Sequence, residues 1–408
     1  MHVHVLDQTN APVVLALMLA DGITGFRQMT GSPELLQQRR DHTLPLDKDA
    51  PALLAMPGEL LTPFNASSIE RAQQQVQQQK QQGADFIKMG LASPDIFFAS
   101  IAAAKQAGIP ILGHLQEGVS AAQASDAGFS SIEHLGPGTP VWIGCSTQEA
   151  QLTSEALQQP RIKLPPVRLP GFVVSRIMKV IQKRLINPAA YENVAYTRLL
   201  QRSFDTYSQD KCRALAERFV ANGTWHTPTL VRLRTQELAD DPAYLHDPFI
   251  PYIPPDALTQ WKAVTERFHK LPQEMRTTYA EAYRRQLTLT KLFADSGVRM
   301  MTGTDSGGQA PGLSIHQEFD QLATAGLSPL QVLQMTTTNA ADFLARSSTM
   351  GEVAPGYNAD LVILDGNPLE SVQNLHRVNA VVRAGFYHPR KDLDATREQA
   401  ISNNGHLN

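Results

Sequence analysis

The chain has 408 residues, enough for one large domain or for roughly two or three domains of about 150 residues each. Hydrophobic residues make up 42% of the sequence and charged residues 18%, so a sizeable core is available and global disorder is excluded. The formal net charge of −3 argues against nucleic acid and against an anionic membrane surface as partners.

No run of apolar residues in the sequence is long enough to cross a membrane, which takes about 18 in a row. Because the chain opens on a strand-like segment without a leader, it is expected in the cytoplasm as it stands. If a leader has been lost, the expected compartment is periplasmic or extracellular. Cys145 and Cys212 are expected to be buried structural residues; a Cys-rich zinc site is excluded, and a disulfide between the two is left open.

The first 134 residues alternate strand-like runs with helical runs. Apolar runs rich in valine, isoleucine and phenylalanine predict strands at residues 2–6, 25–29, 53–56, 86–89, 109–114 and 131–134. Capping residues and apolar spacing predict helices at residues 12–20, 67–82, 95–107 and 119–127.

After residue 134 the alternation of strand-like and helical runs is less regular. Two stretches that contain several prolines are predicted to be insertions, near residues 137–208 and 232–278. The remaining elements are predicted as strands at 224–230 and 299–304 and as helices at 209–222, at 279–296 and, as a pair, within 313–346.

Eight strands, nearly all followed by helices, are the element order of an α/β protein with a (β/α)8 TIM barrel. After residue 350 the sequence favours antiparallel strands with glycine turns instead. We therefore expect a barrel over residues 1–348, a partial C-terminal β-sandwich over 349–390 and a tail over 391–408.

Six residues with metal-binding chemistry are predicted to gather at one end of this barrel. Active sites of TIM barrels lie at the carboxyl ends of the strands, and these six residues lie on strand one or at the ends of strands four, five, six and eight. They are His2, His4, Lys88, His114, His134 and Asp305.

The residue types fit a hydrolytic metal site. Neutral imidazoles are good ligands for Zn²⁺, and Asp305 can both ligate a metal and take a proton from an attacking water. A protonated Lys88 would repel a metal. In an apolar setting its pKa falls, and the neutral amine can react with CO₂ to give a carbamate that bridges two ions.

A family resemblance is carried by the motifs MHVHV, FIKMG, GHL, SIEHLGP, TGTDSG, LSPLQVLQMTTTNAADFL and GEVAPGYNADLVILDGNPL. In these motifs, which span nearly the whole chain, the sequence resembles the amidohydrolase superfamily, in the branch of imidazolonepropionase-like proteins and metal-dependent Xaa-Pro dipeptidases (prolidases). The resemblance implies a barrel with an attached β-sandwich and two divalent ions, most readily zinc. It places His2, His4 and Asp305 on one ion, His114 and His134 on the other, and a carboxylated Lys88 between them.

This chain departs from the family at its start, because a single residue precedes the His-x-His pair. Relatives build half of the β-sandwich from residues upstream of that pair. We therefore expect the antiparallel strands near the C-terminus to be the other half of a sandwich.

The sequence indicates residues that contact the substrate less clearly than it indicates the metal ligands. His226 on strand seven, His316 near a helix start, and Arg232 after strand seven are candidates, the arginine for a substrate carboxylate. The competing interpretation of each is an ordinary packed or solvated side chain.

The sequence thus predicts a binuclear metal-dependent amidohydrolase that cleaves an amide or peptide bond of a small molecule, such as a dipeptide or an N-acyl amino acid, with hydroxide formed on the metals. Cyclic amide, lactone or deaminase substrates are the alternative within enzymes, and an inactive barrel that serves as a binding module is the alternative outside them. Homo-oligomerisation is left open.

Overall fold

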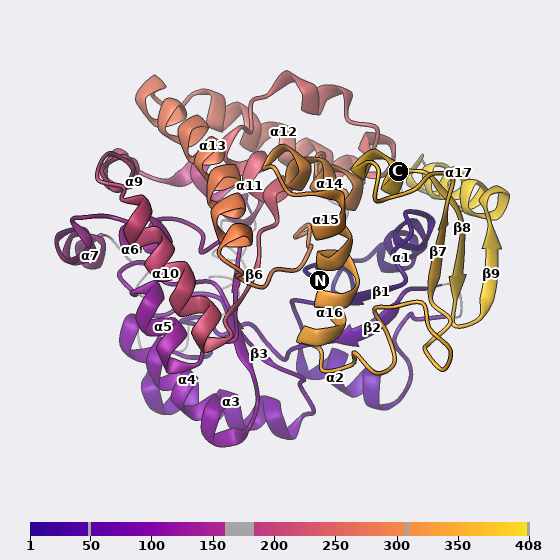
Figure 1. Ribbon diagram of the computed structural model, residues 1–408, viewed down its shortest axis with the longest axis horizontal. Helices are drawn as coiled ribbons and strands as arrows, with labels where there is room; N and C mark the ends of the chain where they lie inside the picture. Colours follow the sequence, from indigo (N-terminus) through magenta and orange to yellow (C-terminus); the bar gives the residue numbers. More distant parts are fainter. Residues whose placement is uncertain (48–49, 160–182, 307–309, 406–408) are drawn as a thin grey trace.

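The computed structural model describes residues 1–47, 50–159, 183–306 and 310–405. It is an α/β structure in which parallel strands and helices alternate, followed by an antiparallel sheet at one side (Figure 1). None of the described helices combines the length and hydrophobicity needed to span a membrane.

The parallel strands form two sheets, each ordered along the chain. The first sheet contains β1 (Gly25–Arg27) and β2 (Ala52–Ala55), and the second contains β3 (Ile87–Met89), β4 (Ile111–Gly113), β5 (Ser131–Glu133) and β6 (Trp225–Thr227). Nearly every residue of the second sheet is fully buried, as expected for parallel strands that are covered on both faces.

The segments predicted as the first and last strands are single bridges rather than strands. Val3 bridges both Gln28 and Ser306, and Met300 bridges His226. The extended backbone is interrupted at Asp305, whose φ of 56° is left-handed, so a continuous ladder cannot run through this segment. The described residues therefore contain no uninterrupted eight-stranded sheet.

The helices surround these strands. Along the chain they are α1 (Ala11–Ala20), α2 (Pro33–Arg40), α3 (Ile69–Gln81), α4 (Pro94–Ala107), α5 (Ala121–Ala127), α6 (Pro140–Gly144), α7 (Glu149–Gln158), α9 (Val194–Asp205), α10 (Gln209–Asn222), α11 (Leu230–Glu237), α12 (Pro255–His269), α13 (Gln273–Asp295), α14 (Ile315–Thr324), α15 (Pro329–Thr336), α16 (Thr338–Phe343) and α17 (Arg390–Gly405).

Local sequence explains where several of these helices begin. In α3 the Ser68 hydroxyl accepts a hydrogen bond from the Arg71 N–H, so the serine cap expected at the start of this glutamine-rich helix is present. Serines 314 and 328 form complete capping boxes at α14 and α15. These signals are local in the chain, and the sequence therefore predicts these helix starts to within a few residues.

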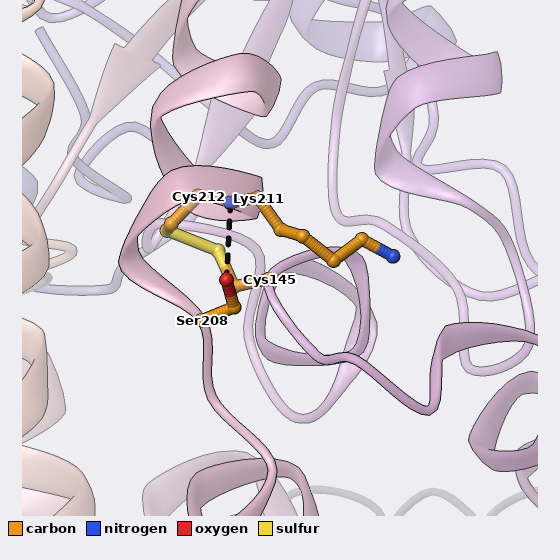
Figure 2. The surroundings of a disulfide bond; sticks show 4 residues. All are labelled: Cys145, Ser208, Lys211 and Cys212. Atoms are coloured by element: carbon orange, nitrogen blue, oxygen red, sulfur yellow. Dashed lines mark hydrogen bonds between the residues drawn. A yellow bond between two sulfur atoms is a disulfide. The ribbon is translucent and has the colours of Figure 1, made fainter.

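A disulfide closes the first insertion. Cys145, at the end of α6, is bonded to Cys212 in α10, and both residues are fully buried (Figure 2). The bond joins residues 67 positions apart. The part of the predicted insertion at 160–182 lies outside the described residues, and the rest contains α6, α7 and α9.

The C-terminal part contains the expected antiparallel sheet, with β7 (Leu361–Leu364), β8 (Val378–Arg383) and β9 (Phe386–Pro389) in that order. A two-residue turn with positive φ at Ala384 and Gly385 joins β8 to β9, as tight hairpins require. One face of β8 packs on α1 and α17 through Val381 and Leu393.

The segment predicted as a tail is instead the helix α17. Leu393 and Ala400, two turns apart, are almost fully buried, and Arg397 between them donates hydrogen bonds to Ala20 and Asp21 at the end of α1. Tertiary packing on α1 thus stabilises a helix that this polar sequence does not announce by itself. Residues 406–408 lie outside the described part of the chain.

Candidate metal centre

The six predicted metal-binding residues come from five separate segments of the chain. Lys88 lies in β3, His114 directly follows β4 and His134 directly follows β5. His2 and Asp305 lie in the two segments that Val3 and Ser306 bridge. Since the strands are parallel, their carboxyl ends meet on one side of the structure.

His2, His4 and Asp305 are in direct contact. The Nε2 atoms of His2 and His4 lie 3.0 and 2.9 Å from Oδ1 of Asp305 and 3.3 Å from each other. Burial alone would raise the pKa of Asp305, but the neighbouring His134 and His2 hold it well below its usual value. The carboxylate is therefore anionic at neutral pH.

The outer nitrogens of three histidines are already used. His2 Nδ1 donates to Glu133 Oε2 at 2.7 Å, His134 Nδ1 pairs with Thr229 Oγ1 at 2.6 Å, and His4 Nδ1 pairs with the Thr30 hydroxyl. A neutral imidazole that donates through Nδ1 carries its lone pair on Nε2. Hydrogen-bonded partners of this kind orient histidines that bind metals.

Glu133 and Arg27 form a fully buried ion pair behind His2. Arg27 Nη2 donates to Glu133 Oε1 at 2.8 Å, and neither side chain has exposed surface. Burial by itself raises the pKa of Glu133, but Arg27 and His2 outweigh it and hold that pKa well below its usual range. The pair therefore fixes a negative charge against the ring of His2.

His114 and His134 extend the cluster. The His134 ring lies 4.7 Å from that of His2 and 5.1 Å from that of His114, centroid to centroid. Burial, assisted by the charge of Lys88, lowers the pKa of His114 to about 3, and burial also lowers the pKa of His134. Both imidazoles are neutral at neutral pH, which is the form that binds metals.

Lys88 is the unusual member of the cluster. Its side chain is 1% exposed, and its Nζ has no hydrogen-bond partner among the described residues. Burial lowers the pKa of its amine to about 8. A buried, unpartnered amine is costly, which is itself a sign of a functional position. It is also the state that carboxylation by CO₂ would relieve.

Two of the six residues have strained backbones. His134 and Asp305 both have φ of 56°, a left-handed conformation that side chains other than glycine rarely adopt. Asp305 directly precedes Ser306, which bridges Val3. His134 directly follows Glu133, the last residue of β5. This turn breaks the strand alternation, so Glu133 and His134 can both face the cluster. Strain of this kind concentrates at functional sites.

The structure therefore brings the predicted residues together. Ligand atoms of His2, His134 and Asp305 lie within 4.8 Å of one another. His4 contacts His2 and Asp305, the ring of His114 lies beside that of His134, and the charge of Lys88 acts on His2 and His134. Sequence reasoning missed Glu133 and Arg27. A carboxylate inside the buried strand Ser131–Glu133 was the available signal, because such a group needs a charged partner.

Two of the three predicted substrate contacts are not at the cluster. His226 is fully buried and packs between the rings of Phe219 and Phe293, because strand alternation turns it away from its neighbour Thr227, which faces Arg27. His316 stacks on His376 and hydrogen-bonds to the Asp21 carbonyl. Both residues have the packed role that was the competing interpretation.

Arg232 does lie at the cluster, with a different partner from the one predicted. Its Nε is 2.9 Å from Oδ2 of Asp305, and its Nη1 donates to the Ile186 carbonyl at 2.8 Å. The side chain is only 10% exposed. Arg232 therefore holds the second oxygen of the Asp305 carboxylate.

Comparison with known proteins agrees with this geometry. Residues 281–386 match the family model described as the amidohydrolase family. Among solved structures, the chain is similar to a bottromycin amidohydrolase (TM-score 0.65, 20% identity, covering 99% of this chain and 79% of that one). It is also similar to a Xaa-Pro dipeptidase with bound methionine in its active site (0.57, 16%, 95% and 85%) and to ochratoxinase from A. niger (0.55, 15%, 95% and 81%).

These findings confirm the predicted resemblance and the prediction of a hydrolase that acts on carbon–nitrogen bonds. The similarity to the solved structures concerns the fold, and it extends over nearly the whole chain.

Proposed function

Because the chain carries an amidohydrolase-family segment within an amidohydrolase fold, we propose that it is a binuclear metal-dependent hydrolase of an amide or peptide bond. The observation that carries this proposal is the cluster of four histidines and one aspartate around a buried, unpartnered Lys88. An ordinary structural role does not explain this gathering well, because His2, Lys88 and His134 are buried polar side chains and the amine of Lys88 has no partner among the described residues.

The donor set fits two divalent ions. His2, His4 and Asp305 would hold one ion, His114 and His134 the other, and a carbamate on Lys88 would lie between them. Histidines whose Nδ1 atoms are already bonded offer Nε2 lone pairs, and zinc favours such ligands. When bound, such ions lower the pKa of water and polarise a carbonyl oxygen.

Asp305 is proposed as the proton carrier. Its Oδ1 faces His2 and His4, and Oδ2 is held by Arg232, so the carboxylate has a fixed orientation. It takes the proton from water as the oxygen bonds to the carbonyl carbon. It then delivers that proton to the leaving nitrogen as the carbon–nitrogen bond breaks.

The substrate class that we propose is a dipeptide or an N-acyl amino acid. The similar structures include a Xaa-Pro dipeptidase, which supports a dipeptide substrate, and a bottromycin amidohydrolase, which supports an amide bond as the bond cleaved. The predicted role of Arg232 in binding a substrate carboxylate is less well supported, because its guanidinium already contacts Asp305 and Ile186. We propose instead that Arg232 orients the carboxylate of Asp305.

We also infer that the parallel strands belong to one (β/α)8 barrel. Hydrogen bonds between neighbouring segments support this inference. Asp85 N–H donates to the Met56 carbonyl, which links the two parallel sheets. On the opposite side, the amino group of Met1 donates to the Thr302 carbonyl at 2.7 Å.

Of the two expected compartments, the disulfide favours the oxidising one. A fully buried Cys145–Cys212 bond is typical of periplasmic or extracellular proteins and is rare in the cytoplasm. Thiol titration of the protein denatured without reductant tests this, because no free thiol is expected with the disulfide formed and two per chain are expected without it.

Metal analysis combined with a substrate panel tests the proposed function. We expect close to two metal equivalents per chain and hydrolysis of some Xaa-Pro dipeptides or N-acyl amino acids that stops on chelation. His114→Ala should lose metal and activity. His269→Ala, which removes an exposed histidine of α12, is the matched control. Protein that binds no metal under zinc supplementation, or activity that survives complete chelation, would refute the proposal.

A further inference from the structure

A cavity lies at the amino ends of the strands whose carboxyl ends carry the metal residues. It has a volume of about 410 Å³, within the usual range for small-molecule sites. Its lining comes largely from residues that directly precede strands, such as Phe86 before β3, Ser130 before β5 and Trp225 at the start of β6. The metal residues occupy the carboxyl ends, so the two sites are on opposite sides of the strand layer.

The walls of this cavity combine polar and apolar surface in similar amounts, and the apolar part is largely aromatic. Phe86, Trp225 and Phe343 contribute rings, and Leu112 and Leu344 contribute aliphatic surface. The Trp225 ring also contacts Arg299, whose guanidinium carbon lies 4.2 Å from the ring centroid. A flat apolar ligand body would pack well against such walls.

One polar atom stands out among the lining residues. Arg27 is fully buried, and its Nη1 has no hydrogen-bond partner among the described residues. Its Nε and Nη2 donate to Met1 and Glu133, so Nη1 is the donor that this lining residue has left for a ligand of the cavity. The guanidinium carbon lies over the rings of Phe86 and Phe343, 5.7 and 5.0 Å from their centroids.

The other charges at the cavity do not satisfy this donor. Asp85 is bonded to the Met56 N–H and paired with Arg39. Arg346, which donates to the Leu54 carbonyl, adds a second positive charge to the lining. An unpaired buried guanidinium N–H calls for an acceptor, and an anionic acceptor gives the strongest bond.

We propose that this cavity binds a small aromatic carboxylate, whose carboxylate accepts a hydrogen bond from Arg27 Nη1 and whose ring packs among Phe86, Trp225 and Phe343. The proposal does not depend on the reaction at the metal centre. It identifies the amino-end face of the strands as a ligand site in its own right.

The test is a calorimetric titration of the metal-loaded full chain with benzoate, and with benzamide as the neutral isostere. We expect saturable benzoate binding and at least about tenfold weaker benzamide binding, because the amide loses the charge-assisted bond. Arg27 also holds Glu133, so the variants leave it in place. Ser130→Phe and Leu344→Phe fill the cavity and should each abolish benzoate binding while metal content stays unchanged.

Two further variants make the result decisive. Gln78→Phe adds the same ring on the exposed face of α3 and should bind benzoate as the parent does. His114→Ala alters the metal centre and should also retain benzoate binding. The proposal is overturned if benzoate does not bind, if benzamide binds equally well, or if binding survives both cavity-filling variants. Loss of binding in His114→Ala alone would assign the carboxylate to the metal centre instead.

Discussion

The candidate metal centre has two halves that differ in how their side chains are held. His2, His4, His134 and Asp305 each have a fixed partner outside the cluster, in Glu133, Thr30, Thr229 and Arg232 respectively. Lys88 is buried and His114 is partly buried, and for neither side chain do we find such a partner among the described residues. Side chains outside the cluster fix the orientation of the first four residues, and we find no such contacts for the other two.

The difference shows two ways in which a buried polar site can be accommodated by the fold. Where partners exist, the site is preorganised, and ligand orientation does not depend on a metal. Where no partner is found, as at Lys88, the buried amine is unsatisfied, and only a bound group could offset the free-energy cost of burying it. The four predictions below test each half, in order of decreasing expected effect.

The largest effect is expected at the unpaired half. Lys88→Ala should lose nearly all bound metal and activity, because it removes the proposed bridging group. Added acetate should restore part of both by occupying the space of the carbamate. Metal content and hydrolysis rate with and without acetate measure this. Full activity in Lys88→Ala or in Lys88→Arg would show that Lys88 is not a ligand.

At the paired half, Asp305→Asn should lower kcat by about 10²–10⁴, the usual contribution of a general base. The four histidines should retain an appreciable part of the metal. The pH–rate profile of the variant is the informative measurement. A profile identical to that of the parent would contradict the role of Asp305 as proton carrier.

Glu133→Gln tests whether the partners matter. Removing the charge behind His2 should weaken metal affinity by about 10–100-fold, as replacements of such outer partners do. The variant also leaves Arg27 without its counter-charge, so thermal melting should accompany the metal titration. Glu217→Gln, at an exposed position of α10, is the control, and equal metal affinity in both variants would refute the idea.

The smallest effect concerns a buried carboxylate outside the centre. Glu318 in α14 is fully buried, and its Oε2 accepts one bond from the Val231 N–H at 2.9 Å. Burial raises its pKa from 4.5 to about 8. Between these values the folded protein holds a proton that the unfolded chain has released, so stability is lost as pH rises from about 4.5 to about 8.

Glu318→Gln should remove this dependence while keeping an oxygen for Val231. We expect its melting temperature to fall less than that of the parent between pH 5 and pH 8, by at least about 2 °C. Melting curves at both pH values check it. Parallel behaviour of the parent and the variant would mean that burial does not shift this carboxyl.

Sequence by itself determined the parts that depend on local chemistry. Serine caps, the strand–helix alternation and the His-x-His pair are readable from neighbouring residues, and the family motifs located Lys88, His114, His134 and Asp305. The antiparallel sheet was also predictable, because glycine turns between apolar runs are local signals.

Only the tertiary structure decided which residues face the site. His226 and Thr227 are adjacent in one strand, yet one packs under helices and the other faces Arg27, and no residue pattern fixed that register beforehand. The Arg27–Glu133 pair joins residues 106 positions apart, and α17 is helical because it packs on α1. Such contacts depend on which segments the fold brings together, and their free energy is gained only after the chain has closed around them.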